Sequence, residues 1–447
     1  MHRRNFLGQT SAALAAAMFT QPLSFPTSPA KKQRLAMVGT GDRGTSMWGI
    51  PVVEEFKDIV EFVGLCDINA GRVETAKKLL GVSCPTYTDF DRMMKEVKPD
   101  RLIVTTVDAT HNEFIIKGMQ YGADIITEKP FTTDEQKCQA ILDAQQKTGK
   151  NIAVTFNYRY SPHRQKIYEL LRSGVIGNIT SADFHWYLDV YHGADYFRRW
   201  HRLRKNSGSL LVHKASHHFD LLNWWINSEP DEVFAFGSLD FYGKNNSFRH
   251  TDCRSCPYKN TCQFYFDITK NQRYVDLYVK NQQYDGYLRD GCVWREDIDI
   301  FDKMAVQIKY ANNLQVSYSL TAYNPYEGYR ITFNGTKGKL DAWIKEREPW
   351  EEDHFDEIQV TTNFGKRDII RIDNNEEGHG GGDVRLRKHI FNPQGEADPW
   401  RQAAGSRDGA MSCLIGIAAR NSIDTGQPVR IQNLVSLKPQ SQRPVGN

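Results

Sequence analysis

The sequence predicts an α/β protein of two domains: an N-terminal doubly wound parallel sheet, and a C-terminal α+β domain on a large, mostly antiparallel sheet. Three observations support this prediction. The chain has 447 residues, which is long for one typical domain. Runs with strand and helix character alternate from Arg34 to Thr148. After Asn151 the strand-like runs become longer and alternate between apolar and polar residues.

The first domain, residues 31–150, begins with a short apolar run that enters a glycine-rich turn. Its third apolar run, residues 101–106, is rich in the β-branched residues that favour strands. Thr133 or Asp134 can cap the last helix. We expect strands at residues 35–38, 60–66, 101–106 and 124–127, and helices at residues 72–80, 113–121 and 133–148. Strands that alternate with helices in this way form a parallel sheet covered by helices.

The second domain, residues 151–447, is expected to pair its strands mainly antiparallel. We expect strands at residues 180–188, 232–241, 304–310, 315–321, 329–334 and 338–342. Ala311-Asn312-Asn313 separates two of them and is typical of a hairpin turn. A sheet of this kind can offer one open face to a substrate or to another subunit. The polar, cysteine-bearing segment at residues 243–300 is interpreted as an insertion.

The composition limits the classes of partner. Charged residues make up 25% of the chain and hydrophobic residues 40%, which is ordinary for a globular protein. The net charge of +3 is small for this length, so it favours neither nucleic acid nor an anionic membrane as a partner. No run after the first 30 residues is expected to span a membrane.

The first 30 residues are predicted to be a twin-arginine signal peptide. Arg3-Arg4-Asn5-Phe6-Leu7-Gly8 precedes a weakly apolar, alanine-rich stretch, and Ser28-Pro29-Ala30 offers a small-residue cleavage site. The mature protein is therefore expected in the periplasm, or otherwise exported by this route. The alternative is a basic N-terminal segment without a targeting role.

A dinucleotide site is predicted where the first strand meets the first helix. Gly39, Gly41 and Gly44 form the pattern G-x-G-x-x-G, which lets backbone N–H groups approach a pyrophosphate. Asp67 ends the second strand, where a carboxylate receives a ribose 2′-hydroxyl and repels a 2′-phosphate. NAD is therefore favoured over NADP, although Arg72 nearby weakens that preference. A glycine-rich turn in an unrelated α/β protein is the alternative.

A second signal lies at the far edge of the same domain. Glu128-Lys129-Pro130 follows the apolar run at residues 125–127, which places a lysine on a turn at the end of a strand. Together with the glycine-rich turn, this arrangement indicates a nicotinamide-dependent enzyme with Lys129 at the reacting carbon.

With these motifs the chain resembles the Gfo/Idh/MocA oxidoreductases, the family of glucose-fructose oxidoreductase and inositol dehydrogenase. The resemblance spans roughly residues 33–430 and is carried by Gly39–Gly44, Thr106 with His111, Glu128–Pro130, Asn157–Arg159 and Ser207–Asp220. It implies a Rossmann domain, an open-faced second sheet, a sugar or polyol substrate and a homo-oligomer, either a dimer or a tetramer. The expected cofactor-binding residues are Gly39, Gly41, Asp42, Arg43, Gly44, Asp67, Arg72, Thr106, His111, Glu128, Lys129, Asn157 and Arg159.

The resemblance also implies the catalytic roles. Lys129 would bind the reacting hydroxyl and His217 would transfer its proton. A histidine titrates near neutrality and can accept a hydroxyl proton, while a lysine ammonium stabilises the developing oxyanion. The alternative for His217 is a hydrogen-bonded structural histidine.

The chain departs from the family where an aspartate is usual. His213 occupies that position, Lys214 follows it, and Ala215 replaces a glycine. On a helix His213 and His217 share a face. Together with Lys129 and Lys214 they predict a cationic pocket and a substrate with an acidic group. The open alternatives are a metal held by the two histidines, and a Lys214 that points to solvent.

Further substrate contacts are expected from three places. Tyr158 follows the first domain. The polar and aromatic stretch at residues 189–201 includes Tyr191, Arg199 and Trp200 and suits stacking on sugar rings. It could equally be an exposed loop on a neighbouring subunit. His379 belongs to a glycine-rich turn that also carries Asp383, and it resembles a late family segment that returns to the active site.

Four cysteines, Cys253, Cys256, Cys262 and Cys292, fall in one stretch of the insertion. Their spacing predicts a structural zinc site. An iron–sulfur cluster and two disulfides are the alternatives. None of these requires a catalytic role.

The sequence therefore predicts an exported oxidoreductase that moves hydride between NAD and a carbohydrate carbon. Because free NAD is not expected outside the cytoplasm, the cofactor should be retained and regenerated in place. A glycoside hydrolase that uses NAD in a redox-neutral cycle is the first alternative. A non-catalytic sugar-binding protein on the same fold is the second.

Overall fold

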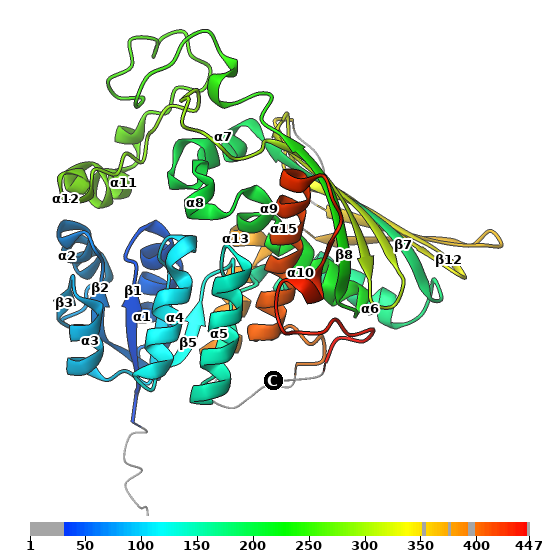
Figure 1. The fold of residues 1–447 in the computed structure, drawn as a ribbon, viewed down its shortest axis with the longest axis horizontal. Helices are drawn as coiled ribbons and strands as arrows, with labels where there is room; N and C mark the ends of the chain where they lie inside the picture. The colour runs from blue at the N-terminus through cyan, green and yellow to red at the C-terminus, as the bar shows by residue number, and fades with distance from the viewer. Residues whose placement is uncertain (1–30, 351–354, 374–376, 392–397, 445–447) are drawn as a thin grey trace, which may run out of the picture. The chain divides into compact units, whose positions relative to one another are not determined.

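A computed structural model describes residues 31–350, 355–373, 377–391 and 398–444 (Figure 1). The predicted twin-arginine segment, residues 1–30, lies outside the described residues. None of the helices within the described ranges combines the length and apolar composition that a membrane crossing requires.

The first sheet has six parallel strands in the order β3-β2-β1-β4-β5-β6. The strands are β1 (Gln33–Val38), β2 (Val60–Cys66), β3 (Thr86–Tyr87), β4 (Arg101–Val104), β5 (Asp124–Thr127) and β6 (Ile152–Val154). This confirms the predicted doubly wound parallel sheet. β6 follows the expected boundary at residue 150, so the first sheet ends later than the sequence indicated.

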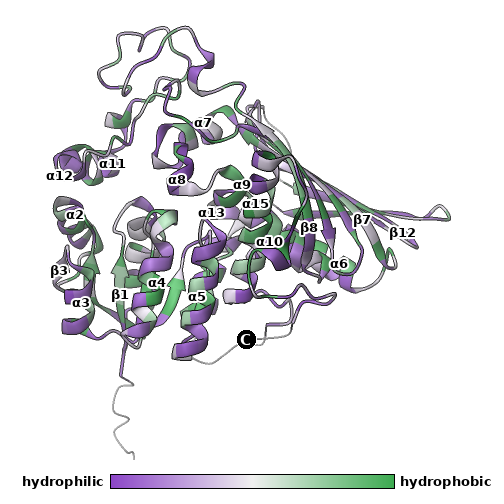
Figure 2. Cartoon of the chain, in the orientation of Figure 1, coloured by the Kyte–Doolittle hydropathy of each residue, from purple (hydrophilic) through white to green (hydrophobic). Residues whose placement is uncertain are grey.

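Helices connect these strands on both faces of the sheet. They are α1 (Ile50–Phe56), α2 (Ala70–Leu80), α3 (Phe90–Val97), α4 (His111–Gln120) and α5 (Glu135–Thr148). Asn69 caps α2 and Asp134 caps α5, because each side chain accepts a backbone N–H of the first helical turn. In Figure 2 β5 is hydrophobic whereas α5 is largely hydrophilic, as expected for a sheet buried beneath helices.

The second sheet has nine strands in the order β14-β13-β12-β11-β7-β10-β9-β8-β15. They are β7 (Ile179–Asp189), β8 (Pro230–Ser238), β9 (Lys303–Tyr310), β10 (Gln315–Asn324), β11 (Glu327–Gly335), β12 (Gly338–Arg347), β13 (Phe355–Thr362), β14 (Arg367–Asp373) and β15 (Val429–Arg430). Only the pair β7 and β10 among these is parallel. The mostly antiparallel prediction is confirmed, and β9 with β10 forms the expected hairpin.

Two buried helices join the sheets. All of α10 (Ala215–Ile226) is buried, and it packs against α15 (Ser406–Thr425). In turn α15 contacts β6 of the first sheet and β8 of the second (Figure 1). The other helices of this part are α6 (Pro162–Arg172), α7 (Val190–Arg198), α8 (Arg204–Ser207), α9 (Leu210–His213), α13 (Glu377–Gly380) and α14 (Gly382–Phe391). This packing fixes α9 and α10, which carry His213 and His217, relative to the first sheet.

The segment predicted as an insertion, residues 243–300, contains two short helices and little other regular structure. They are α11 (Gln272–Leu277) and α12 (Gln282–Asp285). Figure 1 shows both beside α2 of the first domain, and α11 packs directly on α2. The insertion therefore reaches from the second domain to the dinucleotide-binding part of the first.

Candidate active site

A cavity of about 810 Å³ brings most of the predicted residues together. This volume is within the range of small-molecule and cofactor sites. The predicted residues that line it are Gly39, Gly41, Asp42, Arg43, Asp67, Arg72, Thr106, Glu128, Lys129, Asn157, Tyr158, Arg199, Trp200, His213, Lys214, His217 and His379. The glycine-rich turn and the predicted catalytic residues thus share one continuous space.

The glycine-rich turn is tight because its glycines are in close contact with backbone. Gly39 has φ +88°, and a Cβ there would lie 2.6 Å from the carbonyl of Thr105. A Cβ on Gly44 would lie 2.4 Å from the carbonyl oxygen of Gly39. Gly44 therefore packs directly against the backbone of Gly39 and does not line the cavity, whereas Gly41 does. The turn meets the backbone requirement of a pyrophosphate site.

Asp67 stands at the end of β2 with its carboxylate fully engaged. One oxygen accepts the backbone N–H and the hydroxyl of Thr40, at 2.8 and 3.1 Å. The other accepts the N–H of Asn69 at 3.0 Å and the guanidinium of Arg72 at 3.2 Å. Arg72 also donates to Asp285 at 2.5 Å. Two carboxylates around one guanidinium leave this end of the cavity negative, which fits NAD and opposes a 2′-phosphate.

Glu128 anchors the lysine-bearing turn. One of its oxygens accepts the guanidinium of Arg43 at 2.7 Å and the indole N–H of Trp48 at 2.8 Å. Arg43 belongs to the glycine-rich turn, so Glu128 ties that turn to the Glu-Lys-Pro motif. The structure thus connects the two motifs that the sequence singled out separately.

The ammonium of Lys129 donates to the backbone carbonyl of His213, 3.1 Å away at the end of α9. Burial lowers the pKa of Lys129 to about 7, with Asp108 opposing the shift and Lys214 adding to it. The lysine therefore changes charge near neutrality. This contact also holds its amine beside the histidines of the second domain.

His213 is paired with an acid that the sequence analysis missed. Its Nδ1 lies 2.6 Å from a carboxylate oxygen of Asp108, in the 3₁₀ turn that follows β4. Burial lowers the pKa of His213 well below its ordinary value and raises that of Asp108. Asp108 lies just beyond the carboxyl end of a central strand, where parallel sheets place ligand-binding residues. This position after a predicted strand was the sequence feature that could have identified Asp108.

His217 lies on α10 with its ring stacked on Tyr158 at 4.1 Å between centroids. Its Nδ1 is buried, and no partner for it exists among the described residues. Burial, followed by the charges of Lys129 and Lys214, lowers the pKa of His217 well below its ordinary value. The ring is therefore neutral at pH 7 and can accept a proton.

Lys214 is buried, so the alternative that it points to solvent is wrong. The residue is 2% exposed, and its ammonium donates to the hydroxyl of Tyr158 at 2.8 Å. Glu327 lies 3.9 Å from it. Burial alone would raise the pKa of Glu327, but His192, Lys214 and Arg347 outweigh burial and lower it to about 2. Glu327 is thus ionised and offsets part of the positive charge predicted here.

The remaining substrate candidates separate into two groups. Arg199, Trp200 and His379 line the cavity, and Trp200 stacks on His201 at 3.5 Å between centroids. His379 contacts the amide of Asn157 at 3.1 Å and the carboxylate of Asp383 at 3.1 Å. Tyr191 is 76% exposed and does not line the cavity.

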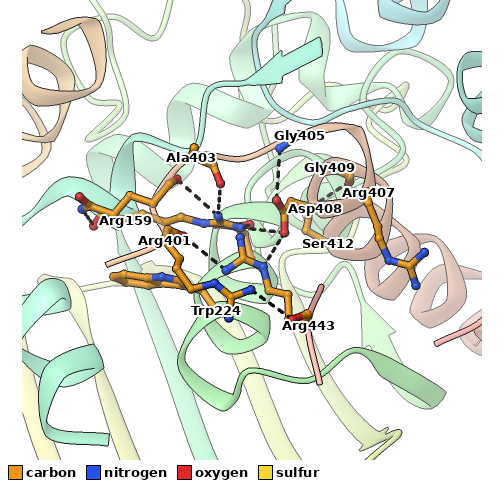
Figure 3. Close-up of polar contacts among 12 residues, drawn as sticks. Arg159, Trp224, Arg401, Ala403, Gly405, Arg407, Asp408, Gly409, Ser412 and Arg443 are labelled. Atoms are coloured by element: carbon orange, nitrogen blue, oxygen red, sulfur yellow. Dashed lines mark hydrogen bonds and ion pairs between the residues drawn. The ribbon is translucent and has the colours of Figure 1, made fainter. Parts of the chain in front are cut away.

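Two predicted cofactor residues lie behind the cavity wall. His111 contacts the carbonyls of Pro130 and Thr106, at 2.8 and 3.2 Å, and so braces two loops. Arg159 is fully buried and bound by Asp220 through two hydrogen bonds of 2.7 and 2.5 Å. Figure 3 shows Arg159 with Arg443 around Asp408, a cluster that joins α15 to the chain end. These surroundings indicate a structural role for Arg159, which does not line the cavity.

The metal predictions are not supported. Within the described ranges, no three or more His, Cys, Asp or Glu side chains are grouped to hold a metal ion, either at His213 and His217 or at the cysteines. Cys253, Cys256, Cys262 and Cys292 do line one small cavity, and all four are free thiols. Arg198 donates to the sulfur of Cys253 at 3.2 Å.

Comparison with known proteins identifies one relative that matches over most of the length and others that match about two fifths of the chain. YteT of Bacillus subtilis (strain 168) is 36% identical over 431 residues, which cover 91% of this chain and 99% of YteT. An inositol 2-dehydrogenase/D-chiro-inositol 3-dehydrogenase of Lactiplantibacillus plantarum is 23% identical over 178 residues, 40% of this chain and 48% of the relative. Glycosyl hydrolase family 109 protein 1 of Akkermansia muciniphila is 28% identical over 197 residues, 41% of this chain and 40% of the relative.

Among solved structures, the WlbA dehydrogenase from Bordetella pertussis in complex with NADH and UDP-GlcNAcA has a TM-score of 0.62. It is 17% identical, and the match covers 90% of this chain and 99% of that one. This likeness establishes the fold.

Two family models match the chain in succession. The oxidoreductase family's NAD-binding Rossmann fold matches residues 33–156, and the oxidoreductase family's C-terminal alpha/beta domain matches residues 168–431. Both descriptions agree with the two sheets. The chain therefore belongs to the Gfo/Idh/MocA family of oxidoreductases.

Proposed function

We propose that this protein interconverts a CH–OH group and a carbonyl group at one carbon of a carbohydrate or polyol, with a tightly held NAD. One observation carries the proposal: Lys129, His213 and His217 face the same cavity as the glycine-rich turn and Asp67. When bound, NAD supplies the acceptor or donor of hydride. Gly39, Gly41 and the backbone of the turn would hold its pyrophosphate.

The side chains at the other end of the cavity would bind the reacting hydroxyl and accept its proton. Protonated Lys129 would hydrogen-bond the reacting hydroxyl and stabilise the negative charge that develops on its oxygen. Neutral His217, which lines the cavity, would accept the hydroxyl proton. The pair of His213 and Asp108 orients the carbonyl that Lys129 contacts, so its role is positioning.

The substrate is proposed to carry an acidic group. Lys214 and Arg199 both line the cavity. Each of these cations already has a carboxylate nearby that offsets part of its charge: Glu327 lies 3.9 Å from Lys214, and Asp195 lies 2.9 Å from Arg199. A carboxylate or similar group that reached Lys214 would gain a charge-assisted hydrogen bond in a site sheltered from water.

Redox-neutral hydrolysis of a glycoside is a second candidate. The resemblance to a protein named as a family 109 glycosyl hydrolase favours it, and so does the presence of two neutral histidines and a lysine that titrates near pH 7. Oxidation at C3 would acidify the neighbouring C–H, elimination would expel the aglycone, and water addition and reduction would follow. Release of a chromogenic aglycone without net NADH formation would favour this cycle over a dehydrogenase.

Export by the twin-arginine route and assembly as a homo-oligomer are further parts of the proposal. Export rests on the residues at 1–30, and assembly on the family resemblance. A non-catalytic sugar-binding protein is disfavoured because Lys129, His213 and His217 are brought together.

The decisive test is to denature the purified protein and identify the released nucleotide and its redox state. Stoichiometric NAD or NADH supports the proposal. Absence of dinucleotide, with no binding of added NAD or NADH, contradicts it. Zinc and iron counted in the same sample would decide whether the cysteines hold a metal.

A further inference from the structure

One segment of the insertion lies across the dinucleotide end of the cavity. Residues 271–289, here called the strap, include α11 and α12 and run beside α2 (Figure 1). The cavity is lined by strap residues Tyr278, Asp285, Tyr287 and Arg289 as well as by the glycine-rich turn. Nothing in the dinucleotide motif itself accounts for these side chains.

Tyr278 contacts the glycine-rich turn directly. Its hydroxyl accepts the backbone N–H of Asp42 at 2.7 Å. A Cβ on Gly41 would lie 3.2 Å from the same hydroxyl, so the ring sits close against the turn. The N–H groups of such turns are the donors that bind pyrophosphate. The hydroxyl of Tyr278 therefore lies beside the expected pyrophosphate position and keeps its own proton for donation to a phosphate oxygen.

Asp285 reaches the ribose end. Its carboxylate accepts the guanidinium of Arg72, which also donates to Asp67. Burial alone would raise the pKa of Asp285, but the hydrogen bond from Asn69, the charge of Arg72 and further hydrogen bonds outweigh burial and lower the pKa. All the contacts of Asp67 come from within the first domain, so Asp285 is the acid that the second part of the chain adds to this end.

The strap is packed on the first domain. The side-chain amide of Asn69 donates to the carbonyl of Asn281 at 2.9 Å, and Asn281 donates to Thr75 at 3.1 Å. A Cβ on Gly71 would lie 2.1 Å from the side-chain oxygen of Asn281. A larger residue at position 71 would therefore displace the side chain of Asn281, so glycine allows α2 to approach the strap this closely.

The far end of the strap is fixed to the second domain. Arg289 is 5% exposed and donates to Asp195 at 2.6 Å. Just beyond it, Asp290 accepts the N–H of Cys253 through its carbonyl at 2.9 Å. The cysteines therefore stand at the base of the strap, and its tip rests on the dinucleotide site.

We propose that the strap is a cofactor-retaining element, in which Tyr278 binds the pyrophosphate and Asp285 closes the ribose end, so that NAD leaves slowly. This rests on the proposed function, because it requires a dinucleotide in the cavity. Release requires the strap to separate from the turn and from α2. The contacts of Asn69, Asp42 and Arg72 with the strap oppose that separation.

The test is the rate of dinucleotide release. Protein loaded with NADH is mixed with excess NAD, and the loss of bound nicotinamide fluorescence is followed. Tyr278→Phe removes the hydroxyl and Asp285→Asn removes the charge. Each is expected to release NADH about tenfold faster than the wild type, the effect of losing one hydrogen bond to a charged group.

Tyr284→Phe is the matched control. Tyr284 belongs to the same segment, is 55% exposed and does not line the cavity, so its release rate should equal that of the wild type. If both Tyr278→Phe and Asp285→Asn released NADH at the wild-type rate, the proposal for the strap would be overturned and the proposed function would remain intact. A wild-type protein that binds no NADH would overturn both.

Hydrogen exchange of the wild-type protein gives a measurement that needs no variant. Addition of NADH is expected to slow the exchange of backbone amides in residues 271–289 as well as in the glycine-rich turn. Protection of the turn without protection of the strap would overturn the proposal.

Discussion

The Nδ1 atom of His213 lies 2.6 Å from the carboxylate of Asp108, so an acid of the first domain orients a histidine of the second. The helix that carries His213 lacks the aspartate that the family usually has there. Asp108 places a carboxylate against this position from the opposite side. The backbone carbonyl of His213 also accepts the ammonium of Lys129, so we propose that the pair positions this lysine.

Removing either member of this pair should have the same effect. Asp108→Asn and His213→Asn are each expected to lower kcat/KM by about ten- to a hundredfold, and the double variant should lose little more. His217→Gln should cost more, about a hundred- to ten-thousandfold, because it removes the proton acceptor. Steady-state kinetics of the four variants checks this. Additive losses from Asp108→Asn and His213→Asn would show that the two residues act independently.

The pH profile of kcat/KM for hydroxyl oxidation should be bell-shaped. His217 must be neutral, and because burial lowers its pKa the acidic limb lies below the ordinary value of 6.5. Lys129 must be protonated, so activity should fall as pH rises through about 7. In Lys129→Arg the alkaline limb should disappear, because arginine stays charged. A wild-type rate that keeps rising into alkaline pH would mean that Lys129 acts as a neutral base.

Lys214 should determine the charge preference of the substrate site. Lys214→Met keeps a long side chain and removes the charge. Its KM should rise about ten- to a hundredfold for an acidic substrate, with a smaller change for a neutral analogue of the same sugar. The comparison uses kcat and KM for both compounds. Equal losses for the two would place Lys214 in the structural support of Tyr158.

The fold followed from periodicity because the first sheet buries short continuous apolar runs, whereas strands of the second sheet such as β9 alternate between buried and exposed residues. β2 and β5 were predicted at their observed bounds, since each is a continuous strand-like run ended by a polar or turn residue. β3 and β6 were missed because strands of two and three residues carry too few positions for a pattern. Pairing with neighbouring strands, which is non-local, defines them.

The site was only partly predictable for the same reason. Gly39, Gly41 and Lys129 belong to local motifs and line the cavity as expected. Asp108 and Tyr278 contact their partners across 105 and 236 residues of sequence, and no local spacing encodes such contacts. Motif membership alone also failed to separate Arg159, which is buried beneath the site, from residues that face the cavity.

Arg159 should matter for stability and little for cofactor binding. Its removal would leave Asp220 buried without its ion-pair partner, which typically costs about 3–5 kcal/mol. Arg159→Met should therefore lower the Tm markedly while folded protein binds NADH with nearly wild-type affinity. Thermal unfolding and an NADH titration below the transition measure the two effects. A selective loss of NADH affinity at unchanged Tm would make Arg159 a cofactor ligand after all.

Lys129 is proposed to act on a substrate hydroxyl beside a bound dinucleotide. The most direct measurement is single-turnover reduction of bound NAD after mixing with a panel of sugars, sugar acids and polyols, in wild type and Lys129→Met. We predict that at least one compound reduces the cofactor in the wild type. In the variant the rate should fall about a thousandfold or more while NAD stays bound. Equal reduction rates in the two proteins would contradict this role of Lys129.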